Sequence, residues 1–486
     1  MDIEIPFKVK EIIDTFVKTG FETYIVGGAV RDILMNKSVY DWDFTTNATP
    51  EQILKIFKDA YYTNEFGTVG TPSEEESERP YEITTFRTEH AYSDFRRPDK
   101  VEWGKTLEED IKRRDFTVNA MALKILNTKS EILNKSKNRN SKSKTNSQSP
   151  VTKYSAITVN VEVIDLYDGQ KDLKYKQIRA VGDPNERFSE DALRMMRALR
   201  IASQLNFKIE KNTFDAINSN KTLIHKISKE RVKDELLKIL ASENPYQGMM
   251  LFKESGLMDE ILPELSKTFG VEQKSPGRHH IYDVGTHCLM ALKFVAEKNN
   301  DPVVRFATLI HDIGKPQTYK RLGSGTITFY NHELVSARIA KNIADRLHFS
   351  NKQKDKLYTL VRFHQFTVDE KQTDSAIRRF IRKVGLENVE DMLDLRIGDR
   401  LGGGARETSW RLEEFKNRLI EVQKQPFTVR DLKIDGNDIM KILALEPGPK
   451  VGKVLQTLYD DVVENNISNE KEALLDRLKE ISEKLN

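Results

Sequence analysis

Two short stretches near the N-terminus carry residue types that bind metal ions and phosphate. Asp41-Trp42-Asp43 places carboxylates at i and i+2, and an extended strand directs such a pair to one side of the chain. Upstream, Val26-Gly27-Gly28-Ala29-Val30-Arg31-Asp32 runs from a β-rich segment into a helical pattern, where paired glycines let the backbone approach an anion closely. Either stretch alone is typical of an ordinary turn or a solvated edge. Together they predict a site in which Mg²⁺ ions hold a nucleoside triphosphate.

Two further stretches supply partners for this site. Tyr81-Glu82-Ile83-Thr84-Thr85-Phe86 alternates with period two, which predicts a strand and makes Glu82 the candidate third acid. In Arg113-Arg114-Asp115-Phe116-Thr117-Val118-Asn119-Ala120, Arg114 would neutralise triphosphate charge, and Asp115 and Asn119 would hold the ribose or phosphates. Taken alone, this second stretch is equally consistent with a helix end.

The elements that must position these residues follow from periodicity. An amphipathic helix is predicted near 8–20, and strands then alternate with helices to about Leu126. Asn, Ser, Lys and Thr fill a predicted disordered insertion at about 128–158, and the fold resumes at Val161. The expected fold is an α/β head with a mixed sheet and helices, followed by a mostly α-helical neck, body and tail. The predicted domain bounds are 1–180, 181–245, 246–410 and 411–486.

Composition limits the class of protein. The chain has 486 residues, 38% hydrophobic and 31% charged, with a net charge of +3, so we expect a soluble protein of several domains. No apolar run has membrane-spanning length and the start lacks a leader-like pattern, so no membrane partner is expected. The single cysteine, Cys288, excludes internal disulfides and favours the cytoplasm. The oligomeric state stays open.

The order of the motifs indicates a family. G-G-x-V-R-D, then D-x-D, then R-R-D-F-T-x-N-A resembles class II CCA-adding enzymes and bacterial poly(A) polymerases, over about the first half of the chain. The resemblance implies nucleotidyl transfer from CTP and ATP to the 3′ end of a tRNA, with Mg²⁺ on Asp41 and Asp43 and Glu82 as the third acid. It also implies that phosphates are contacted by Gly28, Arg31 and Arg114.

A helix predicted over Glu190–Arg200 carries candidate base-recognition residues. Asp191 and Arg194 are three apart, and by spacing alone an ordinary salt bridge is the favoured interpretation. However, cytosine and adenine both present an amino donor beside a ring acceptor, which a carboxylate and a guanidinium match, whereas guanine and uracil present the reverse. In the family, E-D-x-x-R is such a protein template, and the resemblance extends it to Arg197 and Arg200 as further nucleotide contacts. Glu230–Leu236 resembles the motif E-R-x-x-x-E, interpreted as support for the neck.

The choice between CCA addition and poly(A) addition depends on one loop. Ala91-Tyr92-Ser93-Asp94-Phe95-Arg96-Arg97-Pro98 resembles the flexible loop of full CCA-adding enzymes, and the basic-aromatic signature of proteobacterial poly(A) polymerases is absent from the sequence. CCA addition is therefore favoured. Poly(A) or A-only addition stays open, because the catalytic motifs are shared.

A second site is predicted in the helical body. His287, His311-Asp312 and Asp399 form an H…HD…D series, with His332 and His364 in the gap before the final Asp. A lone histidine is more often a core residue than a ligand, but adjacent His and Asp can bind one divalent ion at a helix end. The series resembles HD-domain phosphohydrolases, which implies metal-dependent phosphoester hydrolysis with Mn²⁺, Ni²⁺ or Fe²⁺ on these four residues. Beside a tRNA-end polymerase, the substrate would be a damaged 3′ end bearing a 2′,3′-cyclic phosphate.

Two other classes of function remain open on these residues. The hydrolytic site would be the primary one if the head were only a nucleotide sensor, and the whole chain would be a binding protein if neither site were catalytic. Three acids facing a polyanion argue against both. The tail over 411–486 is expected to contact RNA, and the helical body is expected to grip the tRNA acceptor arm by backbone and shape.

Overall fold

The chain divides into two compact units. The computed structural model describes residues 1–62, 67–73, 80–90, 100–127, 156–273, 281–366, 372–407, 409–423, 429–464 and 466–485. The first unit is Met1–Pro263 and the second is Glu264–Asn486, and the units are described separately below. The predicted loop Ala91–Pro98 lies outside the described residues.

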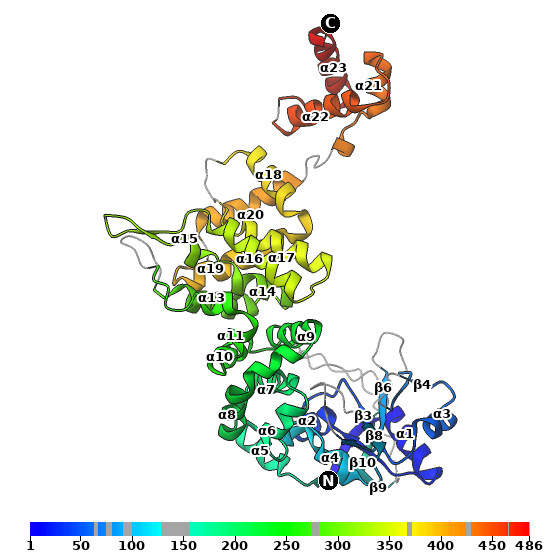
Figure 1. Cartoon of the computed structure of the whole chain (residues 1–486). Coiled ribbons are helices and arrows are strands. Elements are labelled where there is room, and N and C mark those ends of the chain that lie inside the picture. The colour runs from blue at the N-terminus through cyan, green and yellow to red at the C-terminus, as the bar shows by residue number, and fades with distance from the viewer. Residues whose placement is uncertain are drawn as a thin grey trace, which may run out of the picture. The chain divides into compact units, whose positions relative to one another are not determined.

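The first unit is built on an eight-stranded mixed sheet (Figure 1). Its strand order is β1-β10-β9-β2-β3-β6-β5-β4. Every neighbouring pair is antiparallel except β3 and β6, which run parallel. The strands are β1 (Asp2–Pro6), β2 (Thr23–Val26), β3 (Asp43–Thr46), β4 (Tyr61–Tyr62), β5 (Thr68–Thr71), β6 (Tyr81–Thr85), β9 (Met121–Asn127) and β10 (Ala156–Asp165). A separate hairpin joins β7 (Arg87–His90) and β8 (Lys100–Trp103).

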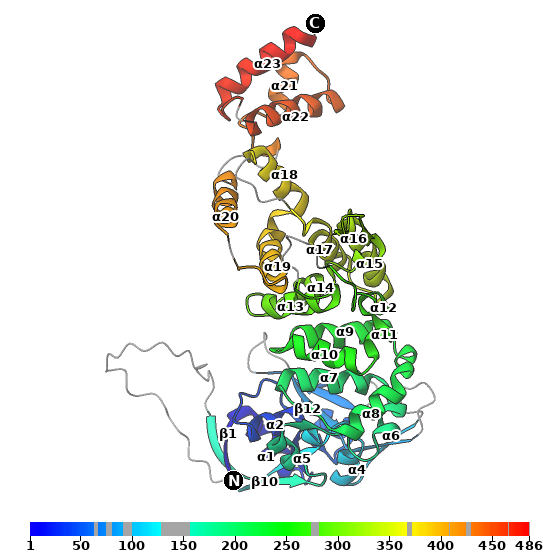
Figure 2. The same cartoon turned by 90° about the vertical axis from the view of Figure 1, so that its left-hand side faces the viewer.

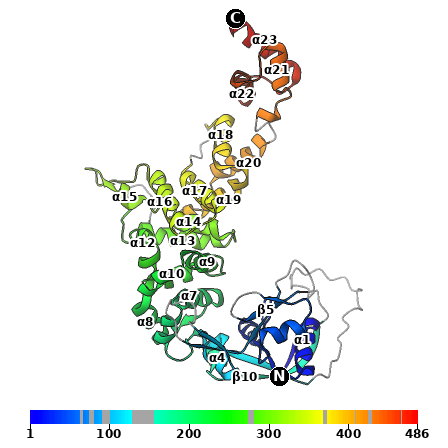
Figure 3. The same ribbon diagram turned by 45° about the vertical axis from the view of Figure 1, so that its right-hand side comes forward.

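The core of this unit forms between the sheet and its first helix. Helix α1 (Phe7–Lys18) buries Val9, Ile12, Ile13 and Phe16, which recur at helical spacing, so the predicted amphipathic helix is present. These side chains join a core that contains Ile25, Phe44 and Ile83 from the strands. Figure 3 shows α1 lying against the sheet. The sheet is therefore held from one side while the first residues of β3 and β6 remain available for chemistry.

The remaining helices of the first unit follow the sheet. They are α2 (Gly28–Leu34), α3 (Pro50–Ile56), α4 (Leu107–Lys112), α5 (Gly169–Tyr175), α6 (Pro184–Glu190), α7 (Leu193–Leu205), α8 (Lys211–Asn220), α9 (Lys229–Leu240), α10 (Pro245–Glu254) and α11 (Leu257–Ile261), with the short strands β11 (Gln177–Ile178) and β12 (Lys208–Ile209). Helix α7 packs against α9 and α10.

Two predicted boundaries are wrong. Strand β10 begins at Ala156 and pairs with β1, so the fold resumes before Val161 and within the range assigned to the insertion. Glu190–Arg200 is not one helix, because α6 ends at Glu190 and α7 begins at Leu193. Asp191 between them has extended backbone angles, and its Oδ1 accepts a hydrogen bond from the Leu193 amide at 3.0 Å. A carboxylate that binds the amide two residues on favours the start of a new helix over continuation of the old one.

The second unit is helical. After α12 (Pro263–Ser266), it contains α13 (Val284–Ala296), α14 (Pro302–Ile310), α15 (Lys315–Thr318), α16 (His332–Arg346), α17 (Asn351–Phe363), α18 (Asp374–Val384), α19 (Val389–Gly402), α20 (Trp410–Gln423), α21 (Gly436–Leu443), α22 (Pro449–Val463) and α23 (Lys471–Leu485), with one small hairpin of β13 (Lys320–Arg321) and β14 (Ile327–Thr328). Helices α21, α22 and α23 share a hydrophobic core of their own.

Two glycines set the approach of α13 and α19, which pack side by side in this unit (Figure 2). A Cβ at Gly398 would lie 2.3 Å from Val295 Cγ2, and a Cβ at Gly402 would lie 2.7 Å from the Ala291 amide nitrogen. Any larger side chain would force the helices apart. The close approach matters because α13 carries His287 and α19 carries Asp399.

The predicted fold class is confirmed: a mixed sheet with helices is followed by a mostly helical remainder. Among the described residues, no helix has both the length and the apolar character needed to cross a lipid bilayer.

Candidate active sites

The predicted acidic site lies where β3 and β6 run side by side. Asp43 is the first residue of β3, and its partner in the parallel register is Glu82 of β6. Asp41 lies just before the strand. Phe44 and Trp42 are buried, so the chain alternates as expected and directs its acids away from the core. Parallel pairing thus brings together acids that are far apart in sequence.

Electrostatics at Asp43 favour a bound cation. Burial raises the pKa of Asp43 to about 6, and the nearby carboxylates of Glu82 and Asp41 add to this although Arg114 opposes it. A divalent ion would offset the repulsion among three acids better than one arginine does. The donors are all carboxylate oxygens, which fits Mg²⁺.

The glycine turn packs directly on this acidic site. Gly27 has a φ of +72°, and a Cβ there would lie 3.1 Å from Asp43 Oδ2 and 3.4 Å from Arg114 Nη1. Only glycine meets both the backbone and the space requirement at this position. The next residue, Gly28, opens α2, and Arg31 Nη2 lies 3.4 Å from where its Cβ would be. The turn therefore brings backbone, one carboxylate and two guanidinium groups together.

Both predicted phosphate-binding arginines are held by other side chains. Arg114 Nη2 donates to Asp110 Oδ2 at 3.0 Å, and Asp110 is fully buried. Arg31 Nη1 donates to Asn119 Oδ1 at 2.8 Å, while its Nε donates to Asp32 Oδ1 at 2.8 Å. Side chains fixed in this way lose little entropy when an anion binds. Asn119, predicted to touch the nucleotide, here holds Arg31.

The predicted template pair does not form a direct salt bridge. Asp191 Oδ2 accepts a hydrogen bond from Arg231 Nη2 at 2.8 Å. Arg194 pairs with Glu190 and donates through Nη2 to the Arg113 carbonyl at 3.1 Å. The break between α6 and α7 separates the two side chains, so the i,i+3 interpretation is wrong. Their polar ends are oriented by separate partners.

The next two arginines of α7 are paired with acids from distant segments. Arg197 Nε donates to Asp115 Oδ2 at 2.7 Å, and Arg200 Nη1 donates to Glu235 Oε1 at 2.9 Å. Burial would raise the pKa of Asp115, but Arg197 and Arg194 hold it below its usual range. Two predicted nucleotide contacts, Asp115 and Arg197, therefore bind each other.

Two residues of the motif Glu230–Leu236, predicted to support the neck, contact candidate nucleotide-binding residues. Its Arg231 contacts Asp191, and its Glu235 contacts Arg200. Spacing within α9 places these two residues one turn apart on the face toward α7. Their type and spacing were visible in the sequence, but the partner helix was not.

The four predicted ligands of the body converge. His287 comes from α13, His311 and Asp312 follow α14, and Asp399 comes from α19. His287 Nε2 lies 3.2 Å from His311 Nε2, 3.1 Å from Asp399 Oδ1 and 3.4 Å from Asp312 Oδ2. Three of the four are buried. Two imidazole nitrogens and two carboxylate oxygens facing one point form a donor set suited to a transition metal.

Asp312 also faces a second group of nitrogens. Its Oδ1 lies 3.1 Å from His332 Nε2 and 3.6 Å from His364 Nε2, and these two nitrogens are 3.3 Å apart. The carboxylate therefore contributes one oxygen to each group of ligands. Both groups have donor atoms close enough together to hold an ion.

Backbone carbonyls fix the orientation of three histidines. The Nδ1 atoms of His311, His332 and His364 lie 2.7, 2.8 and 2.7 Å from carbonyl oxygens three residues earlier. A neutral ring that donates from Nδ1 has its lone pair on Nε2. The Nε2 atom of His311 faces Asp312 Oδ2 in the first group, and those of His332 and His364 face Asp312 Oδ1 in the second. The three rings are therefore oriented as metal ligands before any metal binds.

The charges around these rings also favour a cation. Burial alone would lower the pKa of His311, but Asp312 and Asp399 raise it to about 10. A proton or a metal ion must therefore balance the two carboxylates. Lys315 supplies one positive charge beside these carboxylates, because its Nζ lies 2.6 Å from Asp312 Oδ2. The same Nζ donates a hydrogen bond to Gln273 Oε1 at 2.8 Å.

Three ranges of the chain match known family models. Residues 23–137 match the model described as "Poly A polymerase head domain". Residues 206–269 match "Probable RNA and SrmB-binding site of polymerase A", and residues 328–478 match "tRNA nucleotidyltransferase domain 2 putative".

Two relatives that match along nearly their whole length are both described as CCA-adding enzymes. The CCA-adding enzyme of Ligilactobacillus salivarius is 33% identical over 478 residues, which cover 98% of this chain and 96% of the relative. The CCA-adding enzyme of Lactococcus lactis subsp. lactis is 31% identical over 475 residues, which cover 98% of this chain and 97% of the relative. Among solved structures, the Bacillus stearothermophilus CCA-adding enzyme in complex with CTP has a TM-score of 0.66 and 25% identity, and the match covers 98% of this chain and 97% of that one.

Proposed function

Because the chain belongs to the family of CCA-adding enzymes, we propose that it adds C, C and A to the 3′ end of tRNA from CTP and ATP, releasing pyrophosphate. The observation that carries this proposal is the match to CCA-adding enzymes along nearly the whole chain. The meeting of Asp43 and Glu82 beside the Gly27 turn supports it.

The head would carry out the transfer. Asp41 and Asp43 would hold Mg²⁺, which when bound activates the attacking 3′ oxygen and stabilises the departing pyrophosphate. Glu82 lies beside Asp43 and would orient the metal-binding oxygens. Arg114 and Arg31, already fixed by Asp110 and Asn119, would hold triphosphate charge as bonding changes.

Asp191 and Arg194 would select the base. The carboxylate would accept from the amino group of cytosine or adenine, and the guanidinium would donate to the ring nitrogen. Guanine or uracil would leave both groups unpaired, at about 1–3 kcal/mol each. Arg231 would keep the Asp191 carboxylate in position, and the Asp115–Arg197 and Arg200–Glu235 pairs would hold α7 to the head and to α9.

The test uses a tRNA transcript lacking its 3′ terminal triplet. Purified protein with Mg²⁺ should stop after three added nucleotides and require both CTP and ATP. A long ladder with ATP alone would instead assign poly(A) addition, the first alternative.

A second activity, metal-dependent phosphoester hydrolysis, is favoured by the histidine cluster of the body. His287, His311, Asp312 and Asp399 would hold one Mn²⁺, Ni²⁺ or Fe²⁺ ion, and Asp312, His332 and His364 a second. Bound metal would supply a hydroxide nucleophile near neutral pH. The residues themselves would fix the rings through their backbone hydrogen bonds and exclude bulk water through burial. A 2′,3′-cyclic phosphate at a damaged tRNA end remains the proposed substrate.

Hydrolysis is tested with bis(p-nitrophenyl) phosphate and 2′,3′-cyclic AMP after loading metal-free protein with each metal. Activity that His311→Ala abolishes, with CCA addition intact, is the expected result. Absence of hydrolysis with every metal would remove this second function and leave the first untouched.

Two broader proposals accompany these activities. The region after 411 would bind tRNA, which its match to a tRNA nucleotidyltransferase domain supports. The cytoplasm is the proposed location, in keeping with a single, unpaired cysteine.

A further inference from the structure

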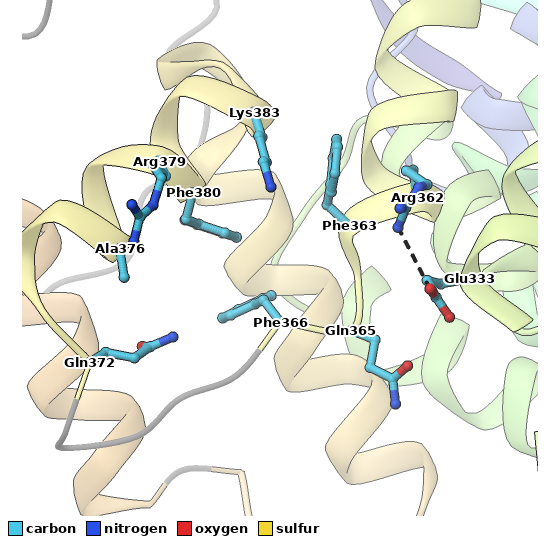
Figure 4. Close-up of a pocket in the computed structure, with 10 residues that line it drawn as sticks. All are labelled: Glu333, Arg362, Phe363, Gln365, Phe366, Gln372, Ala376, Arg379, Phe380 and Lys383. Carbon is cyan, nitrogen blue, oxygen red and sulfur yellow. Dashed lines mark ion pairs between the residues drawn. The ribbon is translucent and has the colours of Figure 1, made fainter. Parts of the chain in front are cut away.

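A pocket in the second unit adjoins the histidine cluster through shared backbone. It has a volume of about 290 Å³ and is lined by Glu333, Arg362, Phe363, Gln365, Phe366, Gln372, Ala376, Arg379, Phe380 and Lys383 (Figure 4). Glu333 directly follows His332, and Phe363 and Gln365 flank His364. The wall of the pocket is therefore built on the same helix ends that carry two of the candidate metal ligands.

Helix α18 presents a basic and aromatic stripe to this pocket. Ala376, Arg379, Phe380 and Lys383 recur at i, i+3, i+4 and i+7, which places them on one face. The opposite face is buried and includes Ile377 and Ile381. Packing thus explains the buried face of α18 and the position of Phe380, but not the exposed Arg379 and Lys383.

The aromatic part of the pocket is preassembled. The rings of Phe366 and Phe380 have centroids 4.7 Å apart, and Phe415 supports them from behind at 5.4 and 5.5 Å. Figure 4 shows Lys383 reaching from α18 into the space between Phe380 and Phe363. A nucleobase has a flat aromatic face that can stack against such a surface.

The polar part of the pocket favours an anion with an attached donor group. The cationic side chains of Arg362, Arg379 and Lys383 line it together with the acidic Glu333. Glu333 Oε1 forms an ion pair with Arg362 Nη1 at 3.7 Å. Within the described part of the chain, Arg379 and Lys383 have no ion-pair partner. Gln372 lines the pocket, and its buried Oε1 accepts no hydrogen bond from any described residue, so rotation of its amide group would let it accept one from a base edge.

We propose that this pocket binds a phosphorylated nucleoside, with its base against Phe366 and Phe380 and its phosphate between Arg379 and Lys383. As a positioning subsite it would hold the nucleoside 3′-phosphate that precedes, in the same RNA, the phosphoester cleaved at the neighbouring metal ligands, and this part rests on the proposed hydrolysis. The same chemistry is offered by a free nucleotide and by the phosphorylated end of an RNA.

Binding is measured by calorimetry on the full-length protein in EDTA, with 3′-GMP as the probe because the proposed neck template rejects guanine. Guanosine and inorganic phosphate are titrated in parallel. We expect 3′-GMP to bind at least about tenfold more tightly than either part, since stacking and charge-assisted contacts add. Equal affinity for phosphate alone would contradict a nucleotide site.

The variant Arg379→Ala/Lys383→Ala removes two exposed cationic side chains, so it should fold normally. The dissociation constant for 3′-GMP should rise at least about tenfold. Lys341→Ala, an exposed lysine of α16 away from the pocket, is the matched control and should leave binding unchanged. An unchanged dissociation constant in the double variant would overturn the proposal.

A competition experiment distinguishes the two sources of the ligand. A short RNA ending in a 3′-phosphate competes with 3′-GMP if RNA ends enter the pocket, and fails to compete if only free nucleotides do.

Hydrolysis is read separately, so the two proposals fail in different ways. With metal present, bis(p-nitrophenyl) phosphate has no nucleoside and should be cleaved equally by wild type and double variant. The KM for the dinucleotide GpA ending in a 2′,3′-cyclic phosphate, whose internal phosphate would lie between Arg379 and Lys383, should rise in the double variant while kcat changes less. Nucleotide binding without any hydrolysis would remove the hydrolytic proposal alone, whereas hydrolysis with an unaffected KM would remove the subsite.

Discussion

The two candidate metal sites differ in the type of their ligands and in how deeply those ligands are buried. In the head, the acids stand at the start of strands, Asp43 is only partly buried and Glu82 is exposed. In the body, the ligands come from helices, and His287, His311 and His364 are buried, two of them fixed by a backbone carbonyl. An open site of oxygen ligands suits a metal that enters with its nucleotide, whereas a closed site with nitrogen ligands suits a metal that stays bound.

Substitution of Asp43 gives the largest expected effect and tests the independence of the two sites. Asp43→Ala should lower CCA addition at least about 10³-fold, because several kcal/mol of transition-state stabilisation are lost. Hydrolysis in the body should be unaffected. Steady-state rates on both substrates measure this, and parallel losses would mean that the sites are coupled.

Metal retention tests the contrast between open and closed sites. After loading with Mn²⁺ and gel filtration, the body should keep metal that elemental analysis detects, whereas the head should lose its ions. Asp312→Ala should remove the retained metal, because both ligand groups use this carboxylate. The exposed His225→Ala is the matched control. If the Asp312→Ala variant retained its metal in full, Asp312 would not be a ligand shared by the two groups.

Base selection tests the neck. Asp191→Ala should reduce the preference for CTP over UTP by about 10–100-fold, since one unpaired group costs about 1–3 kcal/mol. The ratio of kcat/KM for the two nucleotides is the readout. Selectivity that survives the change would assign recognition to other residues.

The smallest effect concerns stability of the metal-free head. Asp43 has a folded pKa of about 6, above its ordinary value of 3.8, so the folded state binds its proton more tightly than the unfolded state. Stability therefore falls as pH rises from about 4 to 6. In EDTA at pH 8, Asp43→Asn should stabilise the head by at most about 3 kcal/mol, and at pH 4 the gain should vanish.

Denaturant unfolding of both proteins at the two pH values measures this difference, with substitution of the exposed Glu108 of α4 by Gln as the control. A loss of stability in Asp43→Asn at pH 8 would show that the carboxylate is a net stabilising group.

The individual site residues were easier to predict from the sequence than the contacts between them. Strand alternation around Asp43 and Glu82 was readable from local periodicity, and so was helix α1. That Glu82 lies beside Asp43 depends on a parallel pairing between distant strands, which local patterns do not specify. The histidine series was readable because four histidines, His287, His311, His332 and His364, occur in one order with two aspartates, whereas the bridging position of Asp312 required the fold.

The errors arose where one residue outweighed a regular pattern. Glu190–Arg200 has helical composition throughout, but the Asp191 side chain binds the Leu193 amide and restarts the helix. Likewise, Arg197 and Asp115 look like separate nucleotide contacts until the fold pairs them. Charged side chains are ambiguous in a sequence, because an ion pair and a ligand contact need the same residue types.

The pairing of β1 with β10 has a consequence for synthesis on the ribosome. The first strand, Asp2–Pro6, has its sheet neighbour at Ala156–Asp165. At roughly 5–20 residues per second, the partner strand is made some ten to thirty seconds later. During that interval Ile3 and Ile5, which end up buried, have no sheet to join. The nascent head should therefore depend on chaperones until β10 emerges, and shortening the segment between β9 and β10 should ease that dependence.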